Sequence, residues 1–353
     1  MSGPDFSIHY GEDNLSNSSM LLPWSQPGWI EAATAWIEDT LSLLGIRLTG
    51  AVTQPHVRPW STVMHAPSDG GLLYFKATAP MLSHEPALTQ ALARWRPDCM
   101  PDVLAADLTR GWFLVRGSGV SLRSLAQRPG QIERWLECLT LYAEVQIDMI
   151  PRSGQLLELN LLDRRLAVLP DQFAHLLEDV DALCIEHEDG LSAAEYDELR
   201  AHLPRFRQLC ALLAAYGIPE TLHHDDFHDG NIFVDAAAQD RSPYTFIDWG
   251  ESCVAHPFFS LVVGLRSAAY TMNLSADDPA LAQLRDAYLR PWRRFAAEDD
   301  LRAAFALANR VGMVNRALTW YLVVRQMQEP YRSEQADAVP GWLHEYLHAV
   351  RTL

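Results

Sequence analysis

Apolar residues return every three or four positions along several stretches of the chain, and this spacing predicts amphipathic helices. Two short apolar runs, 60–65 and 72–77, instead flank the turn-forming sequence Asp69-Gly70-Gly71, which predicts two strands joined by a tight turn. A third strand is predicted at 112–115. The predicted helical stretches are 27–44, 83–95, 132–150, 200–216, 261–265, 301–317 and 342–350.

The order of these elements predicts an α+β chain in two parts. The predicted strands lie mainly in the first third, whereas the chain is mostly helical from Leu122 onward. Between the two parts lies Arg116-Gly117-Ser118-Gly119, whose glycines are typical of a flexible connector. We therefore expect an N-terminal lobe at residues 1–115 and a C-terminal lobe at 116–353, a length that suits two domains.

The residues best suited to chemistry lie in one segment, His223-His224-Asp225-Asp226-Phe227-His228-Asp229-Gly230-Asn231, followed by Asp248-Trp249-Gly250. Asp226 comes two residues after a histidine and five before Asn231. This is the spacing of a kinase catalytic loop, in which the Asp meets the substrate hydroxyl and the Asn meets a metal. Asp248 then begins a D-x-G sequence, the form of the second metal-binding element.

A hairpin is predicted between these two motifs, from strands at 232–235 and 244–247. Symmetric pairing would set residue 231 opposite residue 248, and directly opposed Cβ atoms lie about 5 Å apart. Asn231 and Asp248 would then be close enough to share a cation. Mg²⁺ prefers oxygen ligands and takes one or two protein groups beside substrate phosphates, so an amide and a carboxylate suit it.

The same segment allows two other interpretations. Asp and Asn beside Gly are common in solvated turns. The three histidines and four aspartates between residues 223 and 235 would also suit a hydrolase that activates water on zinc, manganese or iron.

Lysine occurs once in the chain, at Lys76, near the end of the predicted strand 72–77. A position at which the planar fork of arginine does not fit would explain this single exception. The next helix is expected to start with Ser83 as N-cap and Glu85 in its first turn. A strand followed by a helix can place Lys76 beside Glu85, the ion pair that holds the lysine against nucleotide phosphates in kinases. The alternative is a surface cation and a helix-start acid without contact.

The charge balance excludes some partners. Acidic residues number 45 against 28 basic ones, a formal net charge of -17, so no nucleic-acid partner is expected. No apolar run reaches the roughly 20 residues of a membrane helix, and Met1 to Asn14 lack a signal-peptide pattern. Five cysteines without a CxxC pair suit a reducing compartment, so we expect a cytoplasmic protein.

Residues 151–200 contain 12 acids and four arginines. This composition is typical of a solvated helical face, and it would also line a pocket for a cationic substrate, because negative walls concentrate cations. Arg310 and Arg316, on the stretch 301–317, would either approach a phosphate or pair with acids.

The motifs resemble those of the aminoglycoside phosphotransferase and choline-kinase-like families, which have a protein-kinase-like fold. The family pattern H-G-D-[LF]-H-x-x-N compares with residues 224–231, and I-D-[WF]-[GED] compares with 247–250. The resemblance implies phosphoryl transfer from ATP or GTP to the hydroxyl of a small molecule. It implies Asp226 as catalytic aspartate, Asn231 and Asp248 as magnesium ligands, and Lys76 with Glu85 at the nucleotide phosphates.

The nucleotide base is expected against the connector, with Val115 and Gly117 as candidate contacts. The stretch between the first strands, 54–61, carries no glycine-rich flap, and Ser61 is a candidate donor to the phosphates.

Two positions depart from the family pattern. Asp225 replaces the usual Gly and adds a negative charge beside Asp226. Ser260 stands where an Asp is usual, which predicts weaker support for the catalytic loop. These departures leave a nucleotide-binding protein without catalysis as an alternative to a small-molecule kinase. A cationic acceptor such as an aminoglycoside or amino sugar is the acceptor that the acidic segment favours.

Overall fold

The computed structural model describes residues 22–351, apart from 127, 129, 237, 239 and 240. Met1 to Asn14, on which the expectation of no signal peptide rests, lie outside the described residues. Within the described part of the chain, no helix is long and apolar enough to cross a membrane.

An antiparallel five-stranded sheet in the order β1-β2-β3-β5-β4 forms the N-terminal lobe. The turn at Asp69 and Gly70 joins β2 to β3, so that Ser68 pairs with Gly71, as the sequence predicts. The strands are β1 (Thr53–Val57), β2 (Ser61–Ser68), β3 (Gly71–Thr78), β4 (Val103–Asp107) and β5 (Trp112–Arg116).

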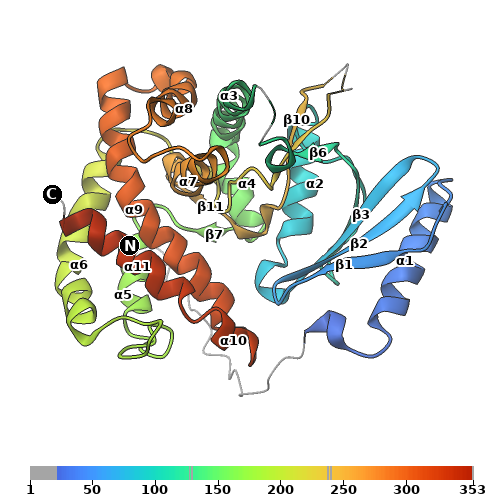
Figure 1. Ribbon diagram of the computed structural model, residues 1–353, viewed down its shortest axis with the longest axis horizontal. Helices are drawn as coiled ribbons and strands as arrows, with labels where there is room; N and C mark the ends of the chain where they lie inside the picture. Colours follow the sequence, from blue (N-terminus) through green and yellow to red (C-terminus); the bar gives the residue numbers. More distant parts are fainter. Residues whose placement is uncertain (1–21, 127, 129, 237, 239–240, 352–353) are drawn as a thin grey trace, which may run out of the picture.

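Two helices lie on opposite sides of this sheet (Figure 1). The first, α1 (Trp29–Leu43), buries Ala33, Ile37 and other apolar side chains in a core shared with the sheet. The second, α2 (Glu85–Trp95), contributes Leu88 and Leu92 to the larger core of the C-terminal lobe. Because α2 packs toward that lobe, its first turn faces the boundary between the lobes.

The expected N-cap at Ser83 is wrong. The cap of α2 is His84, whose side chain makes no capping bond, and Ser83 ends a preceding 3₁₀ turn, Pro80–Leu82.

The chain crosses to the second lobe between Arg116 and Val120. There β6 (Val120–Ser121) joins β9 (Ile232–Val234) and β10 (Tyr244–Phe246) in a three-stranded sheet. Gly119, in this crossing, has φ +94°, and a Cβ there would lie 2.2 Å from the carbonyl oxygen of Val234, so a side chain would force the strands apart. The division at residues 115 and 116 stays a prediction about domains.

The remainder of the C-terminal lobe is mainly helical, around one large apolar core (Figure 1). A second three-stranded sheet, in the order β7-β11-β8, lies at its centre. The longest helix, α9, runs on past residue 317, where the predicted stretch ended. The elements are α3 (Gln131–Met149), α4 (Ser153–Glu158), β7 (Leu162–Asp163), α5 (Leu169–Leu176), α6 (Ala193–Ala214), β8 (Thr221–His224), β11 (Ser252–Ala255), α7 (Ser260–Met272), α8 (Pro279–Leu289), α9 (Glu298–Val324), α10 (Tyr331–Glu334) and α11 (Ala338–Arg351).

Candidate active site

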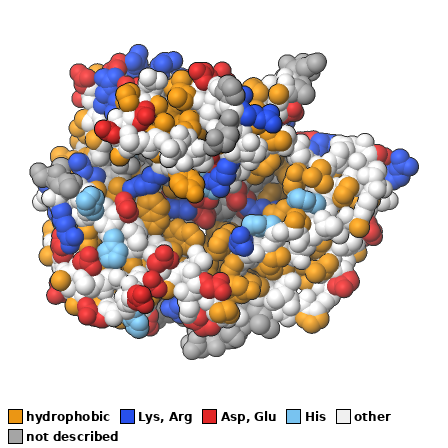
Figure 2. Space-filling model, viewed as in Figure 1, with side chains coloured by type: hydrophobic (Ala, Val, Ile, Leu, Met, Phe, Trp, Pro, Cys, Tyr) orange, Lys and Arg blue, Asp and Glu red, His pale blue; other side chains and the backbone are white. Residues whose placement is uncertain are grey.

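A cavity of about 130 Å³ lies between the two lobes. Apolar side chains of the large sheet, Val63 and Phe113, line it together with Phe233 and Ile247 of the C-terminal lobe. Apolar walls from two lobes suit a flat, aromatic ligand. The space-filling view shows a recess between the lobes with acidic, basic and histidine side chains around it (Figure 2). The predicted nucleotide or metal residues on its lining are Ser61, Lys76, Glu85, Val115 and Asp248.

Lys76 joins the two lobes at one end of this cavity. Its Nζ donates to Glu85 Oε1 at 2.7 Å and to Asp248 Oδ1 at 2.6 Å. Burial lowers the pKa of Lys76, but the two carboxylates outweigh this effect and raise it above its usual value. The contact predicted between Lys76 and Glu85 is therefore present, and the amine is held as a cation facing Asp248.

Gly117 does not line the cavity, although its neighbours Arg116 and Ser118 do. The Gly117 N–H donates to the carbonyl of Leu72 at 3.0 Å, so this donor is already used. The contacts of Val115 and Gly117 with a nucleotide base remain predictions.

Asn231 and Asp248 lie at the same end of the β9–β10 hairpin. The predicted register is wrong by one residue: Ile232 pairs with Phe246, and the N–H of Ile247 donates to the carbonyl of Asn231. Asp248 is thus two residues beyond Phe246, where the ladder ends, in the left-handed conformation with φ +63°. This conformation is uncommon for residues other than glycine, although Asp is among those that tolerate it, and it bends the chain back toward Lys76.

Gly250 allows the close approach of this turn to α2. A Cβ at Gly250 would lie 3.0 Å from Glu85 Oε2. Glycine in the D-x-G sequence therefore leaves room for the carboxylate that pairs with Lys76.

The donor set fits a magnesium ion. The Asn231 side-chain N–H group donates to the carbonyl oxygen of Asp226 at 3.0 Å, which turns the amide oxygen the other way. The Asp248 side chain is 45% exposed on the cleft side and carries a second oxygen beside the one that Lys76 contacts. One amide oxygen and one carboxylate oxygen match the hard, oxygen-seeking character of Mg²⁺.

Asp226 is the second residue after β8 and meets a cation that the sequence did not assign to it. Arg316, on α9, donates from Nη2 to Asp226 Oδ1 at 2.9 Å. Burial raises the pKa of Asp226, but Arg316 and His228 outweigh this and hold it well below its usual range. Of the two predictions for Arg316, pairing with acids is confirmed. No signal in the sequence distinguishes Arg316 from Arg310 on the same helical stretch.

The histidines of the segment have separate roles. His223 contacts Asp225 and Ser260, His224 Nε2 donates to the carbonyl of Ile247 at 2.9 Å, and His228 Nδ1 accepts from the N–H of Gly230 at 2.9 Å. Among the residues that the structure describes, no three His, Cys, Asp or Glu side chains are grouped to hold a metal. The engaged ring nitrogens argue against the metal-hydrolase interpretation.

An aromatic pair crosses between the lobes near Arg316. Trp60, in the turn before β2, meets Trp320 of α9 edge-to-face with ring centroids 5.9 Å apart. Trp320 also lies under the Arg316 guanidinium, 5.5 Å from its ring centroid. The turn without a glycine-rich flap is therefore anchored on the helix that carries Arg316.

Many acids of the 151–200 segment have structural partners. Asp163 pairs with Arg165, and Asp179 accepts from the hydroxyl of Tyr321 at 3.0 Å. Glu195 completes a capping box at the start of α6. These acids stabilise the fold, so the segment's charge alone does not define an acceptor pocket.

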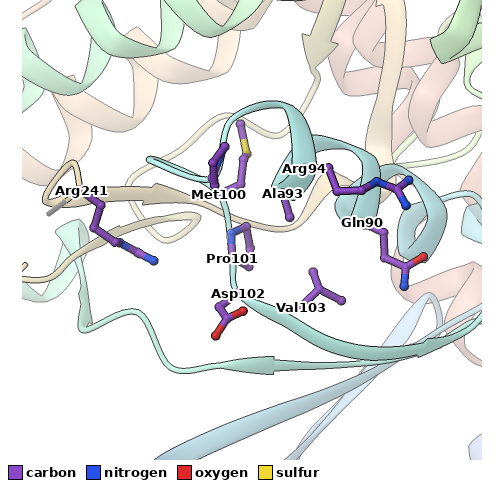
Figure 3. Close-up of a pocket in the computed structure, with 9 residues that line it drawn as sticks. Gln90, Ala93, Arg94, Met100, Pro101, Asp102, Val103 and Arg241 are labelled. Atoms are coloured by element: carbon purple, nitrogen blue, oxygen red, sulfur yellow. The ribbon is translucent and has the colours of Figure 1, made fainter.

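A larger depression, of about 500 Å³, lies beside α2 and β4 (Figure 3). Arg94, Asp102 and Arg241 line it, and Pro101 lines both this depression and the interlobe cavity. It contains none of the predicted site residues, so this depression is not the candidate site.

The model of the phosphotransferase enzyme family matches residues 74–303. The chain belongs to this family. The match includes Lys76, Glu85, Asp226, Asn231 and Asp248, and it confirms the predicted resemblance and the prediction of a phosphotransferase enzyme. No curated protein sequence matches the chain.

Solved structures of phosphotransferases share the fold of this family member. Macrolide 2'-phosphotransferase type I is 16% identical, with a TM-score of 0.55, over 88% of this chain and 97% of that one. A choline/ethanolamine kinase family protein from Mesorhizobium loti is 18% identical, with a TM-score of 0.55, over 92% and 99%. A GDP complex of aminoglycoside 2'-phosphotransferase-IIIa is 12% identical, with a TM-score of 0.57, over 91% and 99%. The two-lobe, kinase-like α+β fold is confirmed.

Buried histidines, among them His84 and His256, make the stability of this phosphotransferase sensitive to acid. Burial lowers the pKa of His84 to about 4 and that of His256 to about 3, from 6.5. Both stay neutral when folded and protonate in the unfolded chain, so their contribution is complete above pH 6.5. As pH falls from 6.5 toward the folded values, each should cost about 1.4 kcal/mol of unfolding free energy per pH unit. Urea unfolding at pH 7, 6 and 5 measures this slope.

His256→Gln should make the slope shallower by one histidine's share. His175, with 67% of its side chain exposed, supplies the control His175→Gln, which should leave the slope unchanged. An identical slope in His256→Gln and the unmodified protein would contradict the assignment.

Proposed function

We propose that this phosphotransferase transfers the γ-phosphoryl group of ATP or GTP to a hydroxyl of a small, cationic acceptor such as an aminoglycoside or amino sugar. The observation that carries this proposal is the contact of Lys76, on the N-terminal lobe, with Asp248, on the C-terminal lobe, at the end of an apolar cavity. It joins the proposed phosphate-binding cation to a proposed metal ligand on opposite sides of one cleft.

In this proposal the nucleotide base occupies the apolar walls, and its phosphates extend toward Lys76. Asn231 and Asp248 would hold Mg²⁺, and the ion would neutralise charge that develops on the phosphates during transfer. Asp226 orients the acceptor hydroxyl and takes its proton. Phosphoryl transfer asks more for position and charge neutralisation than for a strong base, so a carboxylate with a low pKa suits the role.

The charge around Asp226 supports a cationic acceptor. Three carboxylates, Asp225, Asp226 and Glu251, surround the single guanidinium of Arg316. Burial raises the pKa of Glu251 to about 7 against the effect of Arg316, so the group is net negative whether or not Glu251 holds a proton. Such a site attracts positive charge. One solved relative, a GDP and kanamycin complex of an aminoglycoside phosphotransferase, is 12% identical and supports testing both GTP and amino sugars.

A transfer assay with γ-labelled ATP and GTP tests the proposal. The acceptor panel would contain aminoglycosides, amino sugars, choline-like alcohols, and neutral and anionic sugars of similar size. We expect label on a hydroxyl of an amine-bearing acceptor and loss of transfer when EDTA removes the metal. Transfer to neutral or anionic acceptors alone would refute the cationic preference.

A thermal-shift assay with nucleotide, with and without magnesium, separates the alternatives. Magnesium-dependent stabilisation by nucleotide without transfer to any acceptor would support a non-catalytic binding protein. Purification with bound zinc, manganese or iron, and no response to nucleotide, would support a hydrolase. The departures at Asp225 and Ser260 motivated the non-catalytic alternative. Both residues are hydrogen-bonded, Asp225 to Asn315 and Ser260 to His223.

A further inference from the structure

Arg316 is a buried cation on α9 that contacts the catalytic loop. It is 5% exposed and lies within ion-pair distance of Asp226 (2.9 Å), Asp225 (3.5 Å) and Glu251. A buried guanidinium is stable only when carboxylates and hydrogen bonds replace its lost water. Because its donors form a rigid planar fork, the carboxylates that hold Arg316 also determine where it meets Asp226.

Asp225 holds Arg316 and is itself fixed from two other sides. Asn315 Nδ2 donates to Asp225 Oδ1 at 2.9 Å, and His223 Nε2 lies 2.7 Å from the same oxygen. The pKa of Asp225 falls to about 2, because His223 and Arg316 outweigh the effect of burial, so the carboxylate only accepts. His223 must therefore carry its proton on Nε2 in the neutral form, which leaves Nδ1 as an acceptor.

Ser260 completes the chain on the other side of His223. Its Oγ lies 2.7 Å from His223 Nδ1, so the serine hydroxyl donates there. The Tyr142 hydroxyl lies 2.8 Å from Ser260 Oγ and accepts from the backbone N–H of His224 at 3.0 Å. With His223 in this neutral tautomer, the bonds run in one direction, from Tyr142 to Ser260 to His223 to Asp225. All four side chains are buried.

This series of hydrogen bonds connects positions 225 and 260, the two at which the sequence departs from its family pattern. A single imidazole, His223, spans from residue 260 to residue 225, so one carboxylate at either end would satisfy it. The negative charge missing at Ser260 is present at Asp225. At position 225 the carboxylate also lies within ion-pair distance of Arg316, at 3.5 Å. The predicted weakening of the catalytic loop at Ser260 is therefore offset within the same hydrogen-bonded chain.

We propose that Arg316 is a positioning residue that orients the Asp226 carboxylate toward the acceptor. In this proposal Asp225, held by His223 and Ser260, anchors Arg316 and takes the place of the carboxylate that the family pattern has at position 260. This proposal rests on the phosphoryl-transfer function proposed above. It assigns the effect of Arg316 to Asp226 alone, which distinguishes it from a general contribution to packing.

A double-mutant cycle tests the role of Arg316. Arg316→Gln should lower kcat for phosphoryl transfer by about 100-fold, because a displacement of about 1 Å at the reacting groups has this effect, with the KM for nucleotide nearly unchanged. In an Asp226→Asn background the same substitution should cause little further loss, since the two residues act as a unit. Arg316→Lys should recover part of kcat. The control is Arg310→Gln, six residues earlier on α9, which should behave like the unmodified protein.

An equal fold-loss from Arg316→Gln in both backgrounds would overturn the positioning role, as would a rise in nucleotide KM with kcat unchanged. If Arg316→Gln does not fold, Arg316→Lys in the two backgrounds gives the same comparison.

A second cycle does not depend on activity. Asp225→Gly should lower the urea midpoint of unfolding, because Arg316, Asn315 and His223 lose their shared acceptor. Ser260→Asp should also lower it, by adding a second buried carboxylate. The double variant should recover most of both losses, since one carboxylate again meets His223. If the two decreases in urea midpoint simply add in the double variant, the proposal that Asp225 replaces a carboxylate at position 260 is wrong. Recovery of stability in a protein that transfers phosphate to no acceptor would refute the proposed function and leave the anchoring chain intact.

Discussion

Asp226→Asn is expected to lower kcat by about 10²- to 10⁴-fold, the range for removing a positioned proton acceptor. Asparagine keeps the shape of the side chain but cannot take the proton of the acceptor hydroxyl. The KM for nucleotide should change little, because Lys76 and Asp248 line the interlobe cavity and Asp226 does not. Transfer assays with saturating nucleotide and the acceptor identified by the panel measure the effect.

The same substitution should lower the free energy of unfolding only slightly. Arg316 and His228 hold the pKa of Asp226 below its usual range, so its charged form stabilises the fold at neutral pH. The loss is limited because Asp225 and Glu251 still hold the guanidinium. Asp197→Asn, at an exposed position on α6, is the matched control for both measurements. Full activity in Asp226→Asn would refute the assignment of Asp226, and a large loss of stability would show that it acts in folding instead.

Lys76→Arg is expected to lower kcat/KM by about 10²- to 10³-fold, the effect of losing one electrostatic donor to a developing charge. Charge is retained, so the loss would come from shape. The ammonium of Lys76 fits between Glu85 at 2.7 Å and Asp248 at 2.6 Å, with 13% of the side chain exposed. A planar guanidinium is wider and would displace Asp248, a proposed magnesium ligand.

The control is the reverse substitution at an exposed position, Arg47→Lys. Arg47 has 80% of its side chain exposed, so this change should leave kcat/KM unaltered. A magnesium titration of both variants would show whether the Lys76→Arg protein needs more metal for half-maximal activity. Equal kcat/KM in Lys76→Arg and the unmodified protein would contradict the inference drawn from the single lysine of the chain.

Local patterns predicted three of the five strands of the N-terminal sheet, whereas β1 and β4 were not predicted. The turn at Asp69 and Gly70 lies where alternating apolar residues and glycines placed it, because a two-residue turn is determined by its own residues. The hairpin that carries Asn231 and Asp248 was predicted in the right place with the wrong register. Its pairing depends on Ile232 meeting Phe246, and turn-rich residues between two short strands do not determine such a register.

Partners distant in the sequence were harder to predict. Lys76 and Glu85 are nine residues apart, so a strand and a helix start were enough to suggest their contact. Arg316 and Asp226 are 90 residues apart and lie on different elements. The sequence offered pairing with acids for Arg316 but not which acids, and it did not connect Asp225 to Ser260 through His223.

The sequence by itself determined the family, the kinase-like two-lobe fold and the spacing of Asp226, Asn231 and Asp248, because these features follow from short motifs and local periodicity. Only the tertiary structure decided how the departures at Asp225 and Ser260 are accommodated. Tyr142 of α3 contacts Ser260, and Asn315 and Arg316 of α9 contact Asp225. Such contacts form when distant segments pack together, so the identity of the partners is a property of the fold.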